Sequence, residues 1–398
     1  MWVRTIFCAV LSLPAALGAD AALLERIRTR MALNLARAPN YTCVETIERA
    51  TRQGARQEFR TLDRLRLEVA LVEGKELYSW PGAGKFEERT LGEIVPGGTT
   101  TTGEYALHAR TVFASKAPEF GAGVEEELDG RRVVRYDFRV ESAVTKYRVQ
   151  VGTQGAMVPY AGSLWAEAAT LELLRLVVDV EKIPGELGVK RATTQIDYGK
   201  VRVGASDFLL PRRVEFVMRR ADGSESRNRT EFSRCRQYVG QTEISFEEPG
   251  EARLEDQRLV ELELPARLSV ETRLEVEIDS DQAAIGDPVT ARVSYPVKKG
   301  GKVIVPKGAL LRGRVRRIEP GESRGPYFVV ELEFSEVEWE QSRAPWTARL
   351  DAAGPVVGGA RNALSIPVEQ TPGHALLLVR GSRVRLPQGF RLLWMTGS

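Results

Sequence analysis

Residues 131–140 read RRVVRYDFRV, and their apolar side chains recur at every second position. Val134, Tyr136 and Phe138 alternate with charged residues, which places the apolar side chains on one face of an extended strand. One apolar and one polar face are typical of antiparallel sheets, because the strands of a parallel sheet are usually covered on both faces. This stretch therefore predicts an antiparallel sheet with one buried face.

The same alternation recurs on both sides of this stretch, at residues 65–71, 174–180 and 213–218. Asp129-Gly130 and Asp222-Gly223 each separate two such runs. Glycine tolerates the positive φ that tight hairpin turns need, so both pairs predict hairpins. We therefore expect a meander of antiparallel strands over residues 41–246.

A helix is expected before these strands, over residues 20–36. Apolar residues recur there at three- and four-residue steps: Leu24, Ile27, Met31 and Leu35. A second, short helix is expected at residues 103–113, after a loop of glycine and threonine at residues 97–103. We call residues 97–103 the Gly/Thr loop and expect this loop to cover the sheet. The predicted unit is a curved antiparallel half-barrel with one or two helices on its concave face.

A second all-β unit is predicted after a linker. Residues 247–261 are charged, contain Pro-Gly and lose the alternation, so we place the linker there, between domains at 22–246 and 262–398. Short strands spaced by Gly and Pro are typical of a small barrel or sandwich. The apolar phase slips by one residue near Ser335, which predicts a β-bulge. The fold class is thus mainly β.

The first 21 residues read as a cleavable signal peptide. Arg4 precedes a short apolar run, and small residues follow it at Gly18, Ala19 and Ala21. The run is shorter than the roughly 20 residues that a membrane-spanning helix needs. We expect an exported protein, periplasmic or extracellular, that is soluble after removal of residues 1–21.

Two cysteines follow the predicted signal peptide, Cys43 and Cys235. An even number of cysteines in an oxidising compartment favours a disulfide between them. The alternative is two buried free thiols.

The charges are nearly balanced, with 57 Lys and Arg against 54 Asp and Glu, so no nucleic-acid partner is expected. Contact with a membrane would be peripheral at most. The chain has only two histidines, His108 and His374, and no G-x-S-x-G turn, so neither a zinc site nor a serine nucleophile is expected. His108 is expected at the surface. We therefore expect no enzyme activity, no cofactor and no metal.

Two other patterns in the sequence bear on chemistry. The Gly/Thr loop matches half of a phosphate-binding loop, but Glu104 stands where the lysine would be needed. Glu45 and Glu48 lie three apart on a strand and should face opposite sides of the sheet. A pair of carboxylates assembled across strands stays open.

The aromatic residues of the first sheet are the candidate ligand-binding residues. They share faces within their strands and would line an apolar concavity: Tyr78, Trp80, Tyr136, Phe138 and Trp165. The alternative is an ordinary core beneath the helices.

The chain resembles two known families, one in the order of its segments and one in two short stretches of sequence. Residues 20–245 resemble the LolA-like lipoprotein-carrier and envelope-sensor fold. The features that carry this resemblance are one N-terminal helix, the long strands after it, and the turn Gly162–Glu167 that leads into Leu174-Arg175-Leu176. This resemblance implies a half-barrel that holds acyl chains or a lipidated partner. Residues 286–291 and 304–313 resemble the barrel of TrbI-like secretion-channel proteins.

Together these patterns predict an exported, non-enzymatic envelope protein that binds an apolar or lipidated ligand in the concave face of its first sheet. Its partners would be a lipid, a lipidated protein or another envelope protein. The alternative is a structural or assembly module of an envelope or secretion complex.

Overall fold

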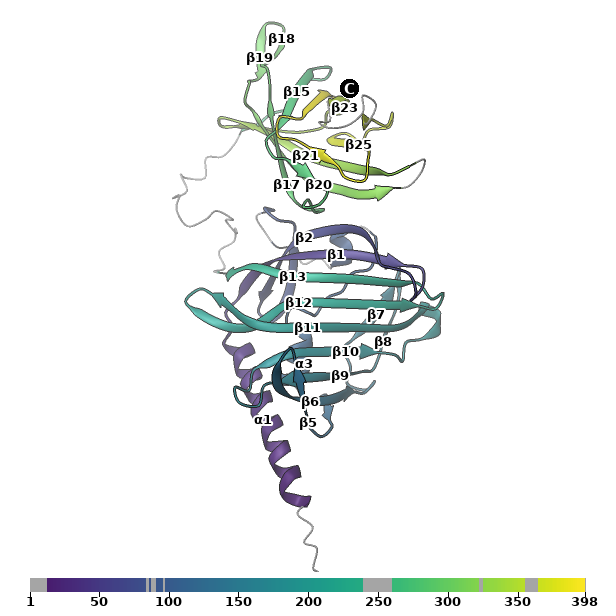
Figure 1. The fold of residues 1–398 in the computed structure, drawn as a ribbon. Coiled ribbons are helices and arrows are strands. Elements are labelled where there is room, and N and C mark those ends of the chain that lie inside the picture. The colour runs from purple at the N-terminus through teal and green to yellow at the C-terminus, as the bar shows by residue number, and fades with distance from the viewer. Residues whose placement is uncertain are drawn as a thin grey trace, which may run out of the picture.

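The computed structural model describes residues 13–83, 86, 91–95, 97–238, 260–321, 325–354 and 364–397, with side chains from residue 20 onward. In these ranges the protein is mainly β, as the sequence predicts, and it forms two large sheets (Figure 1).

The first sheet is antiparallel throughout and curls into a half-barrel (Figure 1). Its strands are β1 (Tyr41–Arg52), β2 (Arg60–Val72), β3 (Lys75–Ser79), β4 (Glu119–Phe120), β5 (Val124–Leu128), β6 (Arg131–Val140), β9 (Tyr160–Ala166), β10 (Leu173–Val180), β11 (Val189–Val203), β12 (Ser206–Arg220) and β13 (Glu225–Gln237). They lie in the order β3-β2-β1-β13-β12-β11-β10-β9-β6, with β4 and β5 both on β6. β7 (Arg148–Val151) and β8 (Gln154–Met157) form a separate pair.

The hairpin turns follow the predicted chemistry. Asp129 and Gly130 join β5 to β6 with φ of 50° and 76°. Two consecutive residues with positive φ are typical of a type I′ turn, which suits the right-handed twist of paired strands. The predicted meander is therefore confirmed, and the wrap of β1 onto β13 brings its first and last strands together.

Helices cover the concave face of the half-barrel. They are α1 (Leu13–Arg37), α2 (Leu91–Ile94) and α3 (Leu107–Ala114), and a 3-10 turn η1 (Gly185–Leu187) follows β10. Ile27 and Met31 of α1, and Val112 and Phe113 of α3, are buried in the core. The predicted helix at 20–36 lies within α1, and most of the predicted helix at 103–113 is α3.

α1 starts before the predicted end of the signal peptide and runs through it, whereas residues 1–12 lie outside the described residues. Among the helices that the structure describes, none has the length and apolar character needed to cross a membrane.

The second sheet forms a smaller all-β unit. Its strands are β14 (Val260–Glu261), β15 (Ser269–Leu274), β17 (Pro288–Val293), β20 (Leu310–Gly321), β21 (Tyr327–Trp339), β22 (Ser342–Pro345), β23 (Arg349–Gly354), β24 (Leu364–Ser365), β25 (His374–Arg380) and β27 (Arg391–Met395). β16 (Ile278–Asp279) pairs with β26 (Arg385–Leu386), and β18 (Val297–Lys299) with β19 (Lys302–Val305).

Aromatic rings fill the interior of this second unit. Phe334 and Trp346 approach the fully buried Trp394 edge-on, with ring centroids 5.6 and 5.7 Å away. The indole Nε1 of Trp394 donates to the hydroxyl of Thr272 at 3.0 Å, which satisfies its buried polar atom.

The bulge predicted near Ser335 is confirmed. Arg312 pairs with Glu336 and Gly313 pairs with Phe334, so Ser335 is the extra residue on β21. The predicted linker falls largely on residues 239–259, which lie outside the described residues. Its last two residues form β14, which pairs with β22, so the second sheet starts inside the predicted linker.

The two sheets touch along β2. Leu65 forms a parallel bridge with Ile285, supported by hydrogen bonds from Arg66 N to Ile285 O (2.8 Å) and from Ile285 N to Arg64 O (2.7 Å). Gly286 lies directly on Trp80, where a Cβ would come within 2.4 Å of the indole ring. Only glycine fits this approach.

Candidate functional site

The predicted disulfide between Cys43 and Cys235 is present in the structure. It joins β1 to β13, with 4.1 Å between the Cα atoms and 192 positions between the two residues in sequence. The hydroxyl of Tyr105 donates to the Sγ of Cys43 at 3.1 Å on the concave side of the sheet.

Three of the five predicted ligand-binding aromatics lie on the concave face. Tyr78, Tyr136 and Phe138 are at most 5% exposed and belong to the buried core. The hydroxyl of Tyr136 donates to the carboxylate of Asp20 at 2.8 Å, which ties α1 to β6. The ring of Phe138 packs edge-on against Tyr160.

The other two predicted aromatics, Trp165 and Trp80, do not lie on the concave face. Trp165 pairs with Arg135 on β6, one position out of phase with the buried Leu164, so it lies on the convex face and donates to Glu126. Trp80 contacts the second sheet, where Arg314 lies over its ring at 5.9 Å. The alternation within one strand shows which residues share a face of that strand. It does not show whether that face is the concave or the convex face of the sheet.

The Gly/Thr loop lies across the concave side and is held by two side chains of the sheet. Arg49 Nη1 donates to the carbonyl of Gly97 at 2.7 Å, and Asn228 Nδ2 donates to the carbonyl of Thr99 at 3.0 Å. Asp63 fixes the guanidinium of Arg49 with two further hydrogen bonds, at 2.7 and 2.5 Å. All three side chains are buried.

Glu76 of β3 holds the start of α3. Its carboxylate accepts hydrogen bonds from the backbone N–H groups of Gly103 (2.8 Å), Ala106 (2.8 Å) and Leu107 (3.2 Å). The residue before α3 supplies no side-chain cap of its own, so a carboxylate from a strand satisfies the free N–H groups and complements the helix dipole. Sequence reasoning missed this contact because cap patterns are local.

α1 is also attached to the rest of the domain by hydrogen bonds between side chains and backbone groups. Asn34 exchanges two hydrogen bonds with the backbone of Leu209, at 2.8 and 3.0 Å, and the carboxylate of Asp20 accepts the backbone N–H of Gly123 at 2.9 Å. A pocket of about 80 Å³ opens beside the helix, lined in part by Met31 and Phe208.

Carboxylates and tyrosines converge on the concave side near the disulfide. We call them the acid–tyrosine cluster: Glu45, Glu76, Glu104, Tyr41, Tyr78, Tyr105 and Tyr198. The rings of Tyr41 and Tyr105 lie 4.9 Å apart, and the charges of Glu104 and Glu76 act on Glu45. Glu45 and Glu104 are each only 6% exposed.

Burial changes the proton affinity of these groups. It raises the pKa of Glu104 to about 7 and raises the pKa of Glu45 well above its ordinary value, the latter with help from the charges of Glu104 and Glu76. It also raises the pKa values of Tyr78 and Tyr105. The site therefore disfavours negative charge as long as nothing compensates it.

The prediction that His108 lies at the surface is wrong. It is buried on α3, and its ring stacks on Tyr147 with 5.6 Å between the centroids. Burial lowers the pKa of His108 to about 4, so the ring is neutral near pH 7. The helical stripe of α3 puts this position on the core side.

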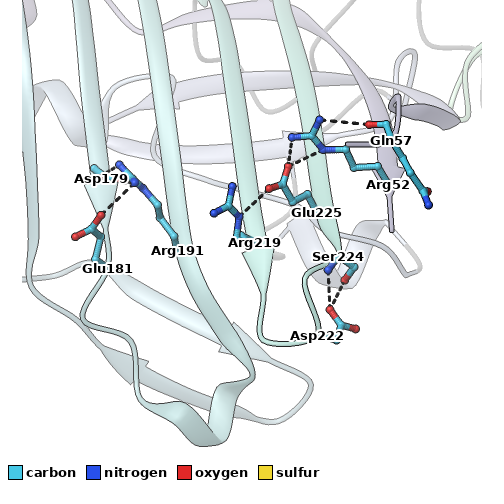
Figure 2. Close-up of polar contacts among 9 residues, drawn as sticks. All are labelled: Arg52, Gln57, Asp179, Glu181, Arg191, Arg219, Asp222, Ser224 and Glu225. Atoms are coloured by element: carbon cyan, nitrogen blue, oxygen red, sulfur yellow. Dashed lines mark hydrogen bonds and ion pairs between the residues drawn. The ribbon is translucent and has the colours of Figure 1, made fainter. Parts of the chain in front are cut away.

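The convex face of the same sheet is lined with paired charges. Figure 2 shows Glu225 of β13 accepting hydrogen bonds from Arg52 and Arg219, and Arg191 paired with Asp179 and Glu181. These charges compensate one another, in contrast to the carboxylates on the concave side.

A groove of about 520 Å³ lies between the two sheets. Its walls combine charged side chains, among them Arg66, Asp279 and Asp287, with apolar ones such as Val276 and Val289. Arg66 and Asp287 form an ion pair across it. Within the described residues, no three His, Cys, Asp or Glu side chains are placed to hold a metal ion.

No protein-family model and no curated protein matches the sequence. Two solved structures are similar in fold, each at 11% sequence identity. One is a DUF1329 family protein from Desulfovibrio piger, covering 57% of this chain and 95% of that chain with a TM-score of 0.30. The other is a LolA superfamily protein from Nitrosomonas europaea, covering 55% and 94% with a TM-score of 0.27.

Proposed function

We propose that the first sheet binds an apolar or lipidated ligand in its concave interior, beneath a cover made of the Gly/Thr loop, α3 and α1. The observation that supports this proposal is how the cover is attached. Among the described residues it joins the sheet through side-chain contacts, such as Arg49 to Gly97 and Glu76 to the start of α3, rather than through strand pairing.

Such a cover can move without unfolding the sheet. A hydrogen bond to a neutral group contributes about 1 kcal/mol net, and a bond to a charged group about 2 kcal/mol. The ladder from β3 to β6 involves none of the cover, so its backbone hydrogen bonds would survive an opening. The main cost of opening is then the exposure of apolar surface, which a ligand would bury again.

The surface beneath the cover suits an alkyl chain. Many of the strand residues that point inward are apolar, and the following are at most 1% exposed: Leu65, Leu67, Val69, Leu164 and Leu176. A chain that displaces helix side chains would meet the same dispersion contacts from these strands. We propose that this surface binds a ligand and does not catalyse a reaction.

The compartment forms part of the proposal. A disulfide on the concave wall of the sheet needs an oxidising environment to persist. Together with the signal-like start of the sequence, this supports a protein of the cell envelope or the extracellular space.

Native mass spectrometry of the protein purified from its own envelope tests the proposal, together with lipid extraction and titration with a fluorescent fatty alcohol. We expect a bound apolar compound or uptake of the alcohol. The variant Arg49→Met, which releases Gly97, should take up the alcohol faster, whereas Arg229→Met, which removes an exposed ion pair on the convex face, should not. Absence of both a bound compound and uptake would contradict the proposal.

An assembly module is the second candidate, and the groove between the sheets favours it. Its polar and apolar walls resemble the composition of protein interfaces. Crosslinking followed by affinity purification separates the two candidates: a module should retain a stoichiometric protein partner, and a carrier should retain lipid.

A further inference from the structure

Three polar atoms of the acid–tyrosine cluster are buried without a hydrogen-bond partner among the described residues. They are Glu45 Oε2, Glu104 Oε1 and the hydroxyl of Tyr198. Each belongs to a side chain that is at least nine-tenths buried, and they come from β1, from the segment before α3 and from β11. Folded proteins pair nearly all buried polar atoms, since each orphan costs about 1–3 kcal/mol.

These atoms face one region. Glu45 lies two positions along β1 from Cys43, whose Sγ accepts a hydrogen bond from Tyr105, and Glu104 immediately precedes Tyr105 in the segment that Glu76 holds at Gly103 and Ala106. Two orphaned carboxylate oxygens that come together from separate elements, with the hydroxyl of Tyr198 also unpartnered, indicate a site that another molecule completes. The acceptors call for a donor of hydrogen bonds, and the two carboxylates call for positive charge.

Among the described residues, no ion pair joins Glu45 or Glu104 to a positively charged side chain. The charge of Arg110 on α3 acts on Tyr41, and its Nε is itself buried without a hydrogen-bond partner, so it does not pair with the two carboxylates. His108 is neutral near pH 7, because burial lowers its pKa to about 4. Glu76 differs from the other two carboxylates, since three backbone N–H groups and the hydroxyl of Tyr78 occupy it.

The surrounding rings narrow the choice of cation. Tyr41, Tyr78 and Tyr105 are buried beside the carboxylates, and the faces of aromatic rings attract ammonium groups. A metal ion would need several convergent ligands, and no such set occurs in the described part of the chain. An organic ammonium satisfies both the carboxylates and the rings.

We propose that the ligand of the first sheet carries a cationic amine head group, which pairs with Glu45 and Glu104 among the tyrosine rings, while its alkyl chain lies along the apolar strands. This inference rests on the proposed function and adds the ligand class. The amine donates hydrogen bonds to the two orphaned carboxylate oxygens and compensates their charge.

A competition titration on the full chain tests the head group. The fluorescent fatty alcohol is displaced at pH 7.5 by dodecylamine, dodecanol or dodecanoate, each below its micelle concentration. We expect dodecylamine to displace it at a concentration at least tenfold lower than dodecanol, and dodecanoate to be the weakest. The double variant Glu45→Gln/Glu104→Gln should bring dodecylamine within twofold of dodecanol. Glu48→Gln, on the opposite face of β1, should keep the tenfold preference and serves as the matched control.

Equal displacement by amine and alcohol would overturn the inference, and so would a preference that survives in the double variant. In both cases the alcohol still binds, so the proposed function stands. If the fluorescent alcohol does not bind at all, the proposed function fails and this inference fails with it.

Discussion

Arg49 and Asp63 form a buried ion pair directly beneath the Gly/Thr loop. Two nitrogens of the guanidinium donate to the two carboxylate oxygens, at 2.7 and 2.5 Å, and the third donates to Gly97. The two side chains are 6% and 7% exposed, so water cannot replace either partner. The pair therefore sets the position of the loop over the interior.

Asp63→Asn is expected to destabilise the protein by about 3 kcal/mol, because it leaves the buried guanidinium of Arg49 without its counter-charge. Urea unfolding measures the change, and hydrogen exchange should show faster opening of residues 97–103 than of β11. Glu215→Gln, in an exposed pair with Arg229, is the control and should cost less than about 1 kcal/mol. Uniform loosening of the whole sheet would contradict the role given to the pair.

Removal of the disulfide by Cys43→Ala/Cys235→Ala is expected to lower the free energy of unfolding by about 2–5 kcal/mol, because the bridge closes a loop of 192 positions in the unfolded chain. A reductant should destabilise the wild-type protein by a similar amount and leave the double variant unchanged. Insensitivity of the wild-type protein to the reductant would speak against a formed bridge.

Stability should depend on pH through Glu104 and His108, in opposite directions. Burial raises the pKa of Glu104 from 4.5 to about 7, so its contribution is complete below pH 4.5 and is lost as the pH rises to 7. Burial lowers the pKa of His108 from 6.5 to about 4, so its contribution is lost as the pH falls through that range.

Glu104→Gln isolates the first effect, since the amide stays neutral. The variant should be more stable than the wild-type protein at pH 8, by up to about 3 kcal/mol, and by less than about 1 kcal/mol at pH 5. Urea unfolding at the two pH values measures the difference. An advantage of equal size at both values would show that the carboxyl titrates normally.

Glu225→Gln should destabilise the protein by about 2 kcal/mol, because the carboxylate is buried between Arg52 and Arg219 (Figure 2). Although burial opposes ionisation, the hydrogen bonds from the two arginines lower the pKa of Glu225. Its contribution is therefore present near neutral pH and is lost as the pH falls below its ordinary range. Thermal unfolding at pH 7 and pH 3 should show a difference between variant and wild type that shrinks in acid.

The fold followed from the sequence where local patterns decide it. The period of two in residues 131–140, the Asp129-Gly130 turn and the phase slip at Ser335 each became the expected element, because strand faces, turns and bulges depend on neighbours in sequence. The stripe in residues 20–36 likewise lies in α1.

The site depended on contacts between distant residues, which one sequence does not show. The prediction that Glu45 and Glu48 face opposite sides of the sheet is confirmed, but Glu104, whose charge acts on Glu45, comes from a loop 59 positions away. Trp165 alternates with its neighbours in β9 as predicted, but its side chain lies on the convex face. The register between β9 and β6 decides which face it shares. The tyrosines that lie near these carboxylates in the sequence are the signal that could have indicated the site.

The account depends most on where an apolar ligand lies. Photocrosslinking with an alkyl diazirine, followed by mass spectrometry of the labelled peptides, measures this directly. The account predicts labels on the inward residues of β2 and on α3, near Leu67 and Val112, with stronger labelling in Arg49→Met. Labels confined to the convex face, to the groove between the sheets or to the second sheet would contradict it.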